Sequence, residues 1–187
     1  MKIRTPKTYD DLLIKKKYNV LEVGGGNHPD RRANVVVDKY VDDNTHRSGN
    51  LVVLKNQKFL QADGEHLPFK DHEFDYVICR HVLEHVEDPI QFVKEQARVA
   101  KMGYLETPSL LGEYIAPKES HRWVIQDIDG KLVLYDKEYL NFKPWDESLC
   151  DKMLVKRSYR REIGATISAM FDIMRTVTKS KVLRTQS

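Results

Sequence analysis

Residues 19–38, NVLEVGGGNHPDRRANVVVD, constrain the fold more than any other segment of this chain. An apolar run at Val20–Val23 ends at the triplet Gly24–Gly26, and a second run at Val35–Val37 ends at Asp38. Strand, glycine turn, strand and carboxylate are typical of a parallel α/β sheet that binds a nucleoside. The glycines let the backbone approach the ligand, and the carboxylate accepts hydrogen bonds from ribose hydroxyls. The segment therefore predicts the ligand-binding edge of such a sheet.

Four later segments follow in the order and spacing of a known family. They read FLQADGEHLPF at 59–69, FDYVICR at 74–80, HVLEHVEDP at 81–89 and GYLETP at 103–108. Together with the glycine segment they resemble the class I S-adenosylmethionine-dependent methyltransferases, especially the branch with an LEHV-DP segment after the fourth strand. The resemblance covers residues 19–108. It implies an α/β, Rossmann-like sheet, mostly parallel with a terminal antiparallel hairpin, and S-adenosylmethionine as cofactor with S-adenosylhomocysteine as product.

The composition is that of one globular domain over residues 1–187. Two cysteines cannot build a disulfide framework and fit a reducing compartment. The first residues contain no apolar signal region, and no apolar run approaches the length of a membrane span. We therefore expect a cytoplasmic monomer or homodimer without a transmembrane segment.

The apolar pattern predicts three regions: a leading helix within residues 1–18, a cofactor-binding sheet core over 19–136 and a basic helical extension over 137–187. Asp88-Pro89 indicates the start of a helix that extends to Met102, with Asp as N-cap and Pro at the first helical position. Short apolar runs predict strands and a hairpin, which the resemblance places at the edge of the sheet. The strands are expected at 19–23, 35–38, 58–62, 74–79 and 103–107, and the hairpin at 121–126 and 131–136 around a turn at 127–130.

Two places depart from the family pattern. Only eight residues, which include Pro29, separate Gly26 from Val35, whereas a parallel crossover normally needs a dozen or more. A loop or single turn is therefore expected in place of the first helix, with His28 where a third glycine is common. After the fifth strand, residues 108–117 show no helical pattern. We expect a loop there that forms a wall of the acceptor pocket.

The resemblance implies a cofactor site at the ends of four strands. Asp38 accepts from both ribose hydroxyls and Asp63 from the adenine amino group, while Glu22 reaches the cofactor's amino group and Arg80 pairs with a carboxylate or an anionic acceptor. Each also has a purely structural interpretation, such as a strand-end cap for Asp38, an Asx-turn for Asp63 or a solvated charge for Arg80. The predicted cofactor-binding set is Glu22, Gly24, Gly25, Gly26, Asp38, Lys39, Asp63, Gly64, Glu65, Cys79 and Arg80.

Two histidines are candidates for catalysis. Transfer from a sulfonium needs mainly alignment, but an oxygen or nitrogen acceptor also needs a base, and histidine titrates near neutrality. His81 and His121 are the candidates, and for each of them a structural role is an equal alternative. Trp123 follows His121 and either stacks on the acceptor or belongs to the core.

The segment from His81 to His85 also matches the inverted zinc-protease signature H-x-x-E-H. Two histidines four residues apart share one face of a helix. The sequence offers no convincing third ligand, and the same residues already fit the methyltransferase pattern. We therefore predict no metal site.

The leading functional hypothesis is an enzyme that methylates a small molecule or a glycan. A second is a nucleic-acid methyltransferase recruited by the basic C-terminal segment, because residues 151–187 hold nine Lys/Arg against three Asp/Glu. A third is a non-catalytic S-adenosylmethionine-binding module, which the shortened glycine region keeps open. A nicotinamide dehydrogenase is disfavoured because Asp38 follows the glycines too soon.

Overall fold

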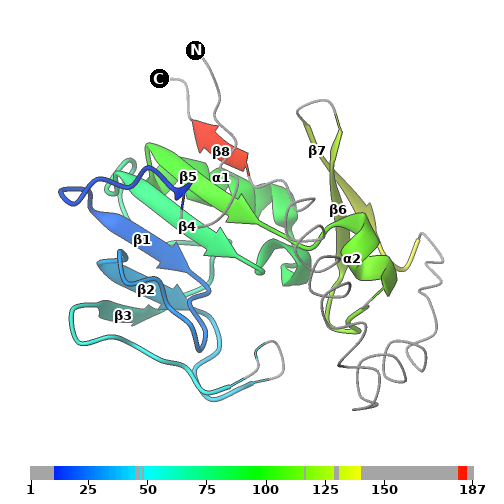
Figure 1. Cartoon of the computed structure of the whole chain (residues 1–187), viewed down its shortest axis with the longest axis horizontal. Helices are drawn as coiled ribbons and strands as arrows, with labels where there is room; N and C mark the ends of the chain where they lie inside the picture. The colour runs from blue at the N-terminus through cyan, green and yellow to red at the C-terminus, as the bar shows by residue number, and fades with distance from the viewer. Residues whose placement is uncertain are drawn as a thin grey trace, which may run out of the picture. The chain divides into compact units, whose positions relative to one another are not determined.

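A computed structural model describes residues 11–44, 47, 49–115, 117–128, 131–139 and 181–184 (Figure 1). The chain divides into two compact units, residues 1–107 with 180–187 and residues 108–179. The described residues contain no helix that is long and apolar enough to cross a membrane.

The first unit is built on a six-stranded sheet with the strand order β3-β2-β1-β4-β5-β8. β1 to β5 are parallel, and β8 runs antiparallel to β5 at the edge. This arrangement confirms the α/β, Rossmann-like and mostly parallel fold expected from the sequence. The strands are β1 Val20–Val23, β2 Val35–Asp38, β3 Lys58–Gln61, β4 Tyr76–Arg80, β5 Met102–Glu106 and β8 Lys181–Arg184.

The strand register brings the polar ends of the strands to one edge of the sheet. Val23 of β1 pairs with Cys79 of β4, and Arg80 pairs with Glu106 at the end of β5. Asp38 ends β2 beside Gln61 of β3. The glycine triplet follows β1 and therefore begins at the same end of the sheet as Asp38, Arg80 and Glu106, which are the last residues of β2, β4 and β5.

One face of the sheet is covered by α1, Pro89–Val99. Asp88 caps this helix by accepting a hydrogen bond from the backbone N–H of Gln91 at 2.9 Å, and Pro89 opens the first turn. The N-cap expected at Asp88 and the proline expected at the first helical position are therefore present, but the helix ends at Val99 and not at the expected Met102. Phe92 and Val99 of α1 are fully buried, which anchors the helix against the sheet.

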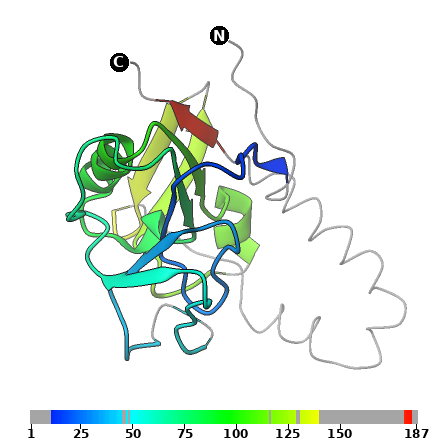
Figure 2. The ribbon, with the colours of Figure 1, turned by 90° about the vertical axis from the view of Figure 1, so that its left-hand side faces the viewer.

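The opposite face is covered by the leading segment, residues 11–18 (Figure 2). Leu12, Ile14 and Tyr18 pack against the cluster that includes Val20 and Ile78. The leading helix expected within residues 1–18 is absent from residues 12–17, while residues 1–10 lie outside the described part of the chain. Leu12 is buried and Leu13 is 68% exposed, so the sheet contacts recur every second residue, as in an extended segment rather than a helix.

The connection from β1 to β2 contains turns but no helix, which confirms the shortened crossover. Polar side chains stabilise this connection in the place of a helix. The carbonyl of Val20 accepts from the N–H of Asn34 at 2.8 Å, and the side chain of Asn34 accepts from the N–H of Val20 at 2.8 Å. Within the loop, Asp30 forms an ion pair with Arg32 at 2.8 Å.

The second unit holds α2 Leu110–Ile115, β6 Trp123–Ile128 and β7 Lys131–Asp136. The loop expected at 108–117 is wrong in part, because α2 forms there after Ser109, whose Oγ accepts from the N–H of Gly112 at 3.0 Å. The hairpin is confirmed, with β6 continuing to Ile128 through the start of the expected turn; residues 129–130 lie outside the described part.

The expected place of the hairpin is wrong. β6 and β7 form a two-stranded sheet of their own, and β8 is the antiparallel strand at the edge of the large sheet. β8 comes from the extension 137–187, for which the sequence predicted helix. Residues 140–180, which make up most of the predicted helical extension, lie outside the described part of the chain.

Candidate functional site

The glycine triplet has a backbone that other residues would not easily adopt. Gly24 and Gly26 have positive φ angles of 74° and 55°, a region that strongly favours glycine. A Cβ atom at Gly24 would stand 2.1 Å from Cγ2 of Val82, and one at Gly25 would stand 2.8 Å from Cγ1 of Val36. The triplet therefore combines left-handed turns with close packing against β2 and the segment after β4.

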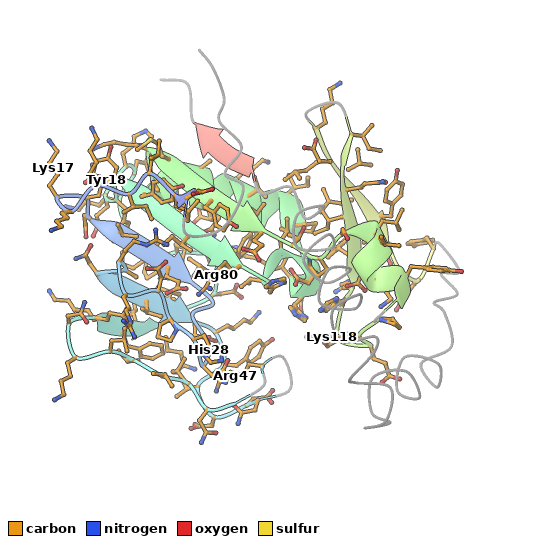
Figure 3. All side chains as sticks on the ribbon, in the orientation of Figure 1. Lys17, Tyr18, His28, Arg47, Arg80 and Lys118 are labelled. Atoms are coloured by element: carbon orange, nitrogen blue, oxygen red, sulfur yellow. The ribbon has the colours of Figure 1, made fainter. Side chains whose placement is uncertain are left out.

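Glu22 is a buried carboxylate that joins three elements. Its side chain is 1% exposed. Its Oε2 accepts from the backbone N–H of Asp30 at 2.6 Å, and its Oε1 accepts from Nη2 of Arg80 at 3.0 Å. The same nitrogen of Arg80 donates to the carbonyl of His28 at 2.7 Å (Figure 3). Burial raises the pKa of Glu22, and the hydrogen bonds from Asp30 and Arg80 offset part of that effect.

Asp38 faces the glycine loop at the end of β2. Its Oδ2 accepts from the backbone N–H of Gly26 at 3.3 Å, and its Oδ1 accepts from the N–H of Tyr40 at 3.0 Å. Nη1 of Arg47 lies 3.8 Å from Oδ1. Because each carboxylate oxygen can accept about two hydrogen bonds, these contacts orient the group and leave it able to accept more.

Asp63 and Lys39 form an ion pair beyond the ends of β3 and β2. Nζ of Lys39 lies 2.7 Å from Oδ2 of Asp63. The other oxygen of Asp63 accepts from the N–H of Glu65 at 2.9 Å, the Asx-turn that was the structural alternative for this residue. Burial works to raise the pKa of Asp63, but the hydrogen bonds from Lys39 and Glu65 outweigh it and lower the pKa.

Gly64 and Glu65 fasten the segment after β3 to α1. A Cβ atom at Gly64 would stand 2.4 Å from Cε2 of Phe92, and the carbonyl of Gly64 accepts from Nε2 of Gln96 at 3.0 Å. The carboxylate of Glu65 accepts from the backbone N–H of Asp88. These two residues thus fix the backbone around Asp63.

Cys79 lies within β4 and not beyond its end, because the strand continues through Arg80. Its side chain is buried, and burial raises the pKa of the thiol well above its usual range. A buried, uncharged thiol in mid-strand is a core residue, so the strand contributes to the site at Arg80 and beyond.

His81 lies between two carboxylates. Its Nδ1 is 3.3 Å from Oε1 of Glu84, and its Nε2 is 3.3 Å from Oε1 of Glu106. These contacts, with Glu106 first and Glu84 second, raise the pKa of His81 to about 9. An imidazolium cannot accept a proton, so the structure argues against His81 as a general base at neutral pH.

The segment from His81 to His85 does not have the geometry of a helical zinc motif. Only Leu83–His85 form a short 3₁₀ helix, and His81 precedes it with a φ of 54°. The two histidines therefore do not share a helical face, which the inverted zinc signature requires.

In the second unit, His121 forms a buried pair with Glu113. Nδ1 of His121 contacts Oε1 of Glu113, and both side chains are at most 5% exposed. Nζ of Lys137 lies 3.5 Å from the other carboxylate oxygen and donates to the carbonyl of Lys118 at 2.7 Å. The sequence alone did not indicate Glu113, because only the folding of α2 against β6 brings it to His121.

Comparison with known proteins gives this geometry a context. Residues 33–105 match the family model described as "Methyltransferase domain". The chain is 34% identical to protein MJ1123 of Methanocaldococcus jannaschii, with 46% of each chain covered. It is 36% identical to the uncharacterized methyltransferase YcgJ of Bacillus subtilis over 35% of this chain and 25% of that protein. It is 43% identical to the ubiquinone/menaquinone biosynthesis C-methyltransferase UbiE of Haemophilus ducreyi over 29% of this chain and 21% of that protein.

The chain thus spans less than half the length of these relatives. The crystal structure of Bacillus YcgJ is also similar, with 25% identity, a TM-score of 0.41 and coverage of 52% of this chain and 47% of that chain. The family match begins two residues before β2 and extends through most of β5. This match to a methyltransferase domain supports the resemblance of residues 19–108 to the class I S-adenosylmethionine-dependent methyltransferases.

Proposed function

We propose that this chain binds S-adenosylmethionine at the edge of the sheet where β1 to β4 end and transfers its methyl group directly to a small molecule or a glycan. The observation that supports this most is the pair of carboxylates at neighbouring strand ends. Asp38 stands against the N–H of Gly26, and Asp63 is held by Lys39. An ionised carboxylate only accepts hydrogen bonds. One carboxylate is therefore suited to the two hydroxyls of ribose, and the other is suited to the amino group of adenine.

The methionine end of the cofactor belongs, in this proposal, beside Glu22 and Arg80. These residues already form an ion pair at 3.0 Å, and Arg80 is 24% exposed in its side chain. Its guanidinium carries five donor hydrogens, so it can hold Glu22 and a ligand carboxylate together. Glu22 has both carboxylate oxygens engaged, which makes it the scaffold of this part of the site.

Methyl transfer requires a general base only when the acceptor atom is oxygen or nitrogen. Of the two candidate histidines, His121 fits that role better. Its Nδ1 contacts Glu113, an arrangement that fixes the ring and leaves proton transfer to Nε2. We propose His121 as the base and residues 108–123 as the acceptor side, because these residues directly follow the C-terminal end of β5 in the sequence. His81, a cation at neutral pH, is assigned to positioning.

An acceptor among small organic molecules is supported by one relative. UbiE of Haemophilus ducreyi is named as a C-methyltransferase of ubiquinone and menaquinone biosynthesis, although the similarity covers 29% of this chain. A carbon acceptor would need alignment more than a base. This relative therefore supports the small-molecule class without choosing the acceptor atom.

The experiment that tests the proposal is a screen with labelled S-adenosylmethionine over small phenols, sugars and RNA. Transfer to a small molecule or sugar supports the proposal. Transfer to RNA alone, with activity that falls steeply as salt rises, would instead support the nucleic-acid alternative. Cofactor binding without transfer to any of the three classes would support a non-catalytic binding module.

A further inference from the structure

His81 has a backbone conformation that its side chain disfavours. Among the described residues, His72 and His81 have positive φ angles outside glycine, at 55° and 54°. Such a conformation is costly for an L-residue and persists only where the surroundings hold it. The N–H of His81 donates to the carbonyl of Glu106 at 2.9 Å, which is one of the contacts that hold it.

The imidazole of His81 supplies the other contacts. It bridges Glu84 of the 3₁₀ helix and Glu106 at the end of β5, at 3.3 Å to each. The side chain of Glu84 is 1% exposed, so its charge needs a nearby cation. Tyr104 donates to the second oxygen of Glu106 at 2.7 Å, and the charge of Arg80 also acts on Glu106.

The bridge is connected to the glycine loop through one side chain. Val82 follows His81 in the sequence, and its Cγ2 lies 2.1 Å from the position that a Cβ atom at Gly24 would take. The backbone of Gly24 is fixed from the other side by its N–H, which donates to the carbonyl of Val37 at 2.8 Å. The position of Val82, and with it the space around Gly24, therefore depends on the turn at His81.

We propose that His81 is a positioning residue of the cofactor site, whose cation between Glu84 and Glu106 fixes the turn that packs Val82 against Gly24. The proposal rests on the proposed function, in which the cofactor lies on the glycine loop. It assigns His81 no direct contact with the reacting atoms. It explains why a histidine occupies a left-handed position that glycine or asparagine would adopt at lower cost.

The titration of His81 makes the bridge dependent on pH. Hydrogen bonds from the imidazole to Glu106 and Glu84 raise the pKa of His81 from the ordinary histidine value of 6.5 to about 9. Because the folded pKa is the higher one, the stability that the bridge contributes is complete below the unfolded value. The bridge itself loses its cation as the pH rises through about 9. Nearby Cys79 does not add a charge there, because burial raises the pKa of its thiol.

Calorimetric titration with S-adenosylhomocysteine tests the proposal on three full-length proteins: wild type, His81→Gly and His72→Gly. Both substitutions relieve a left-handed backbone, but only the first removes the bridge. Near neutral pH we expect about tenfold weaker binding for His81→Gly and a change within about twofold for His72→Gly. Above about pH 9 the affinity of the wild type should approach that of His81→Gly. The ligand's own amino group titrates with both proteins and cancels in this ratio.

A second variant keeps the test independent of the folding of His81→Gly. Glu106→Gln removes one of the two carboxylates and should move the loss of affinity to lower pH, in step with the His81 titration followed by NMR. A wild-type affinity that does not change relative to His81→Gly with pH, or a Glu106→Gln profile that stays in place, overturns the proposal. Wild-type protein that binds no S-adenosylhomocysteine at any pH contradicts the proposed function itself.

Discussion

Cγ2 of Val82 lies 2.1 Å from the position that a Cβ atom at Gly24 would take. The contact joins the glycine loop after β1 to the segment after β4, two parts of the chain that are far apart in the sequence. It means that Gly24 is required for two reasons, its positive φ and the absence of a side chain, whereas Gly26 is required for its φ alone.

Alanine substitutions should separate these two reasons. Gly24→Ala combines backbone strain with a steric clash and should lower the free energy of unfolding by about 2–4 kcal/mol. Gly26→Ala meets no atom within 4 Å and should cost only about 1–2 kcal/mol. Urea denaturation of both variants measures the difference. Equal losses would show that Val82 can move away and that the packing at Gly24 is not tight.

The pair of His121 and Glu113 should matter for transfer and not for cofactor affinity. Loss of a general base in His121→Ala should reduce the rate of methyl transfer by about 10²–10⁴ with an oxygen or nitrogen acceptor. Affinity for S-adenosylhomocysteine should stay close to that of the wild type, because the proposed cofactor contacts lie on β1 to β4. Trp123→Ala is the companion variant, and loss of a positioning contact there should raise the acceptor KM. Unchanged turnover in both variants would move the acceptor site elsewhere.

The ion pair of Asp63 and Lys39 should contribute stability that disappears in acid. The folded pKa of Asp63 lies below the ordinary aspartate value of 3.8, so its contribution to stability is present above the unfolded pKa and is lost as the pH falls through the folded pKa. The side chain of Asp63 is 32% exposed, so solvent screening keeps the effect small. The difference in Tm between wild type and Asp63→Asn should therefore be constant near neutrality and vanish in strong acid. A difference that grows on acidification would contradict this assignment.

The segment from His81 to His85 should need no zinc. The protein should fold and bind S-adenosylhomocysteine in the presence of a chelator, since the two histidines do not share a helical face. Elemental analysis together with circular dichroism after chelation tests this. Stoichiometric zinc that is lost with the fold in His85→Ala would refute it.

The parallel sheet could be predicted from the sequence because its strands are short apolar runs that end at polar residues or glycine, as at Val20–Val23 and Val35–Asp38. The start of α1 could also be predicted from local signals, because Asp88 is an N-cap residue and Pro89 occupies the first helical position. The shortened crossover followed from the small number of residues between Gly26 and Val35. These features depend on neighbours in the sequence, which is why pattern and spacing reveal them.

Other features depend on contacts between distant residues. The leading segment has the composition of a helix, yet packing against the sheet buries Leu12 and exposes Leu13. The antiparallel partner of β5 is β8 and not the hairpin, and strand pairing of this kind is not encoded in either strand alone. The ion pairs of His81 and His121 likewise need Glu106 and Glu113, whose proximity arises only in the folded chain.

The central claim is that Gly24–Gly26, Asp38 and Asp63 build an S-adenosylmethionine site. Calorimetric titration of the wild type, Asp38→Ala and Glu22→Gln with S-adenosylhomocysteine and with NAD tests it most directly. We predict binding of S-adenosylhomocysteine in preference to NAD. We also predict a loss of about 2–4 kcal/mol in Asp38→Ala, where two charged hydrogen bonds to the ribose are removed, and a smaller loss in Glu22→Gln. Tight NAD binding without S-adenosylhomocysteine binding, or an Asp38→Ala variant that binds like the wild type, would contradict the account.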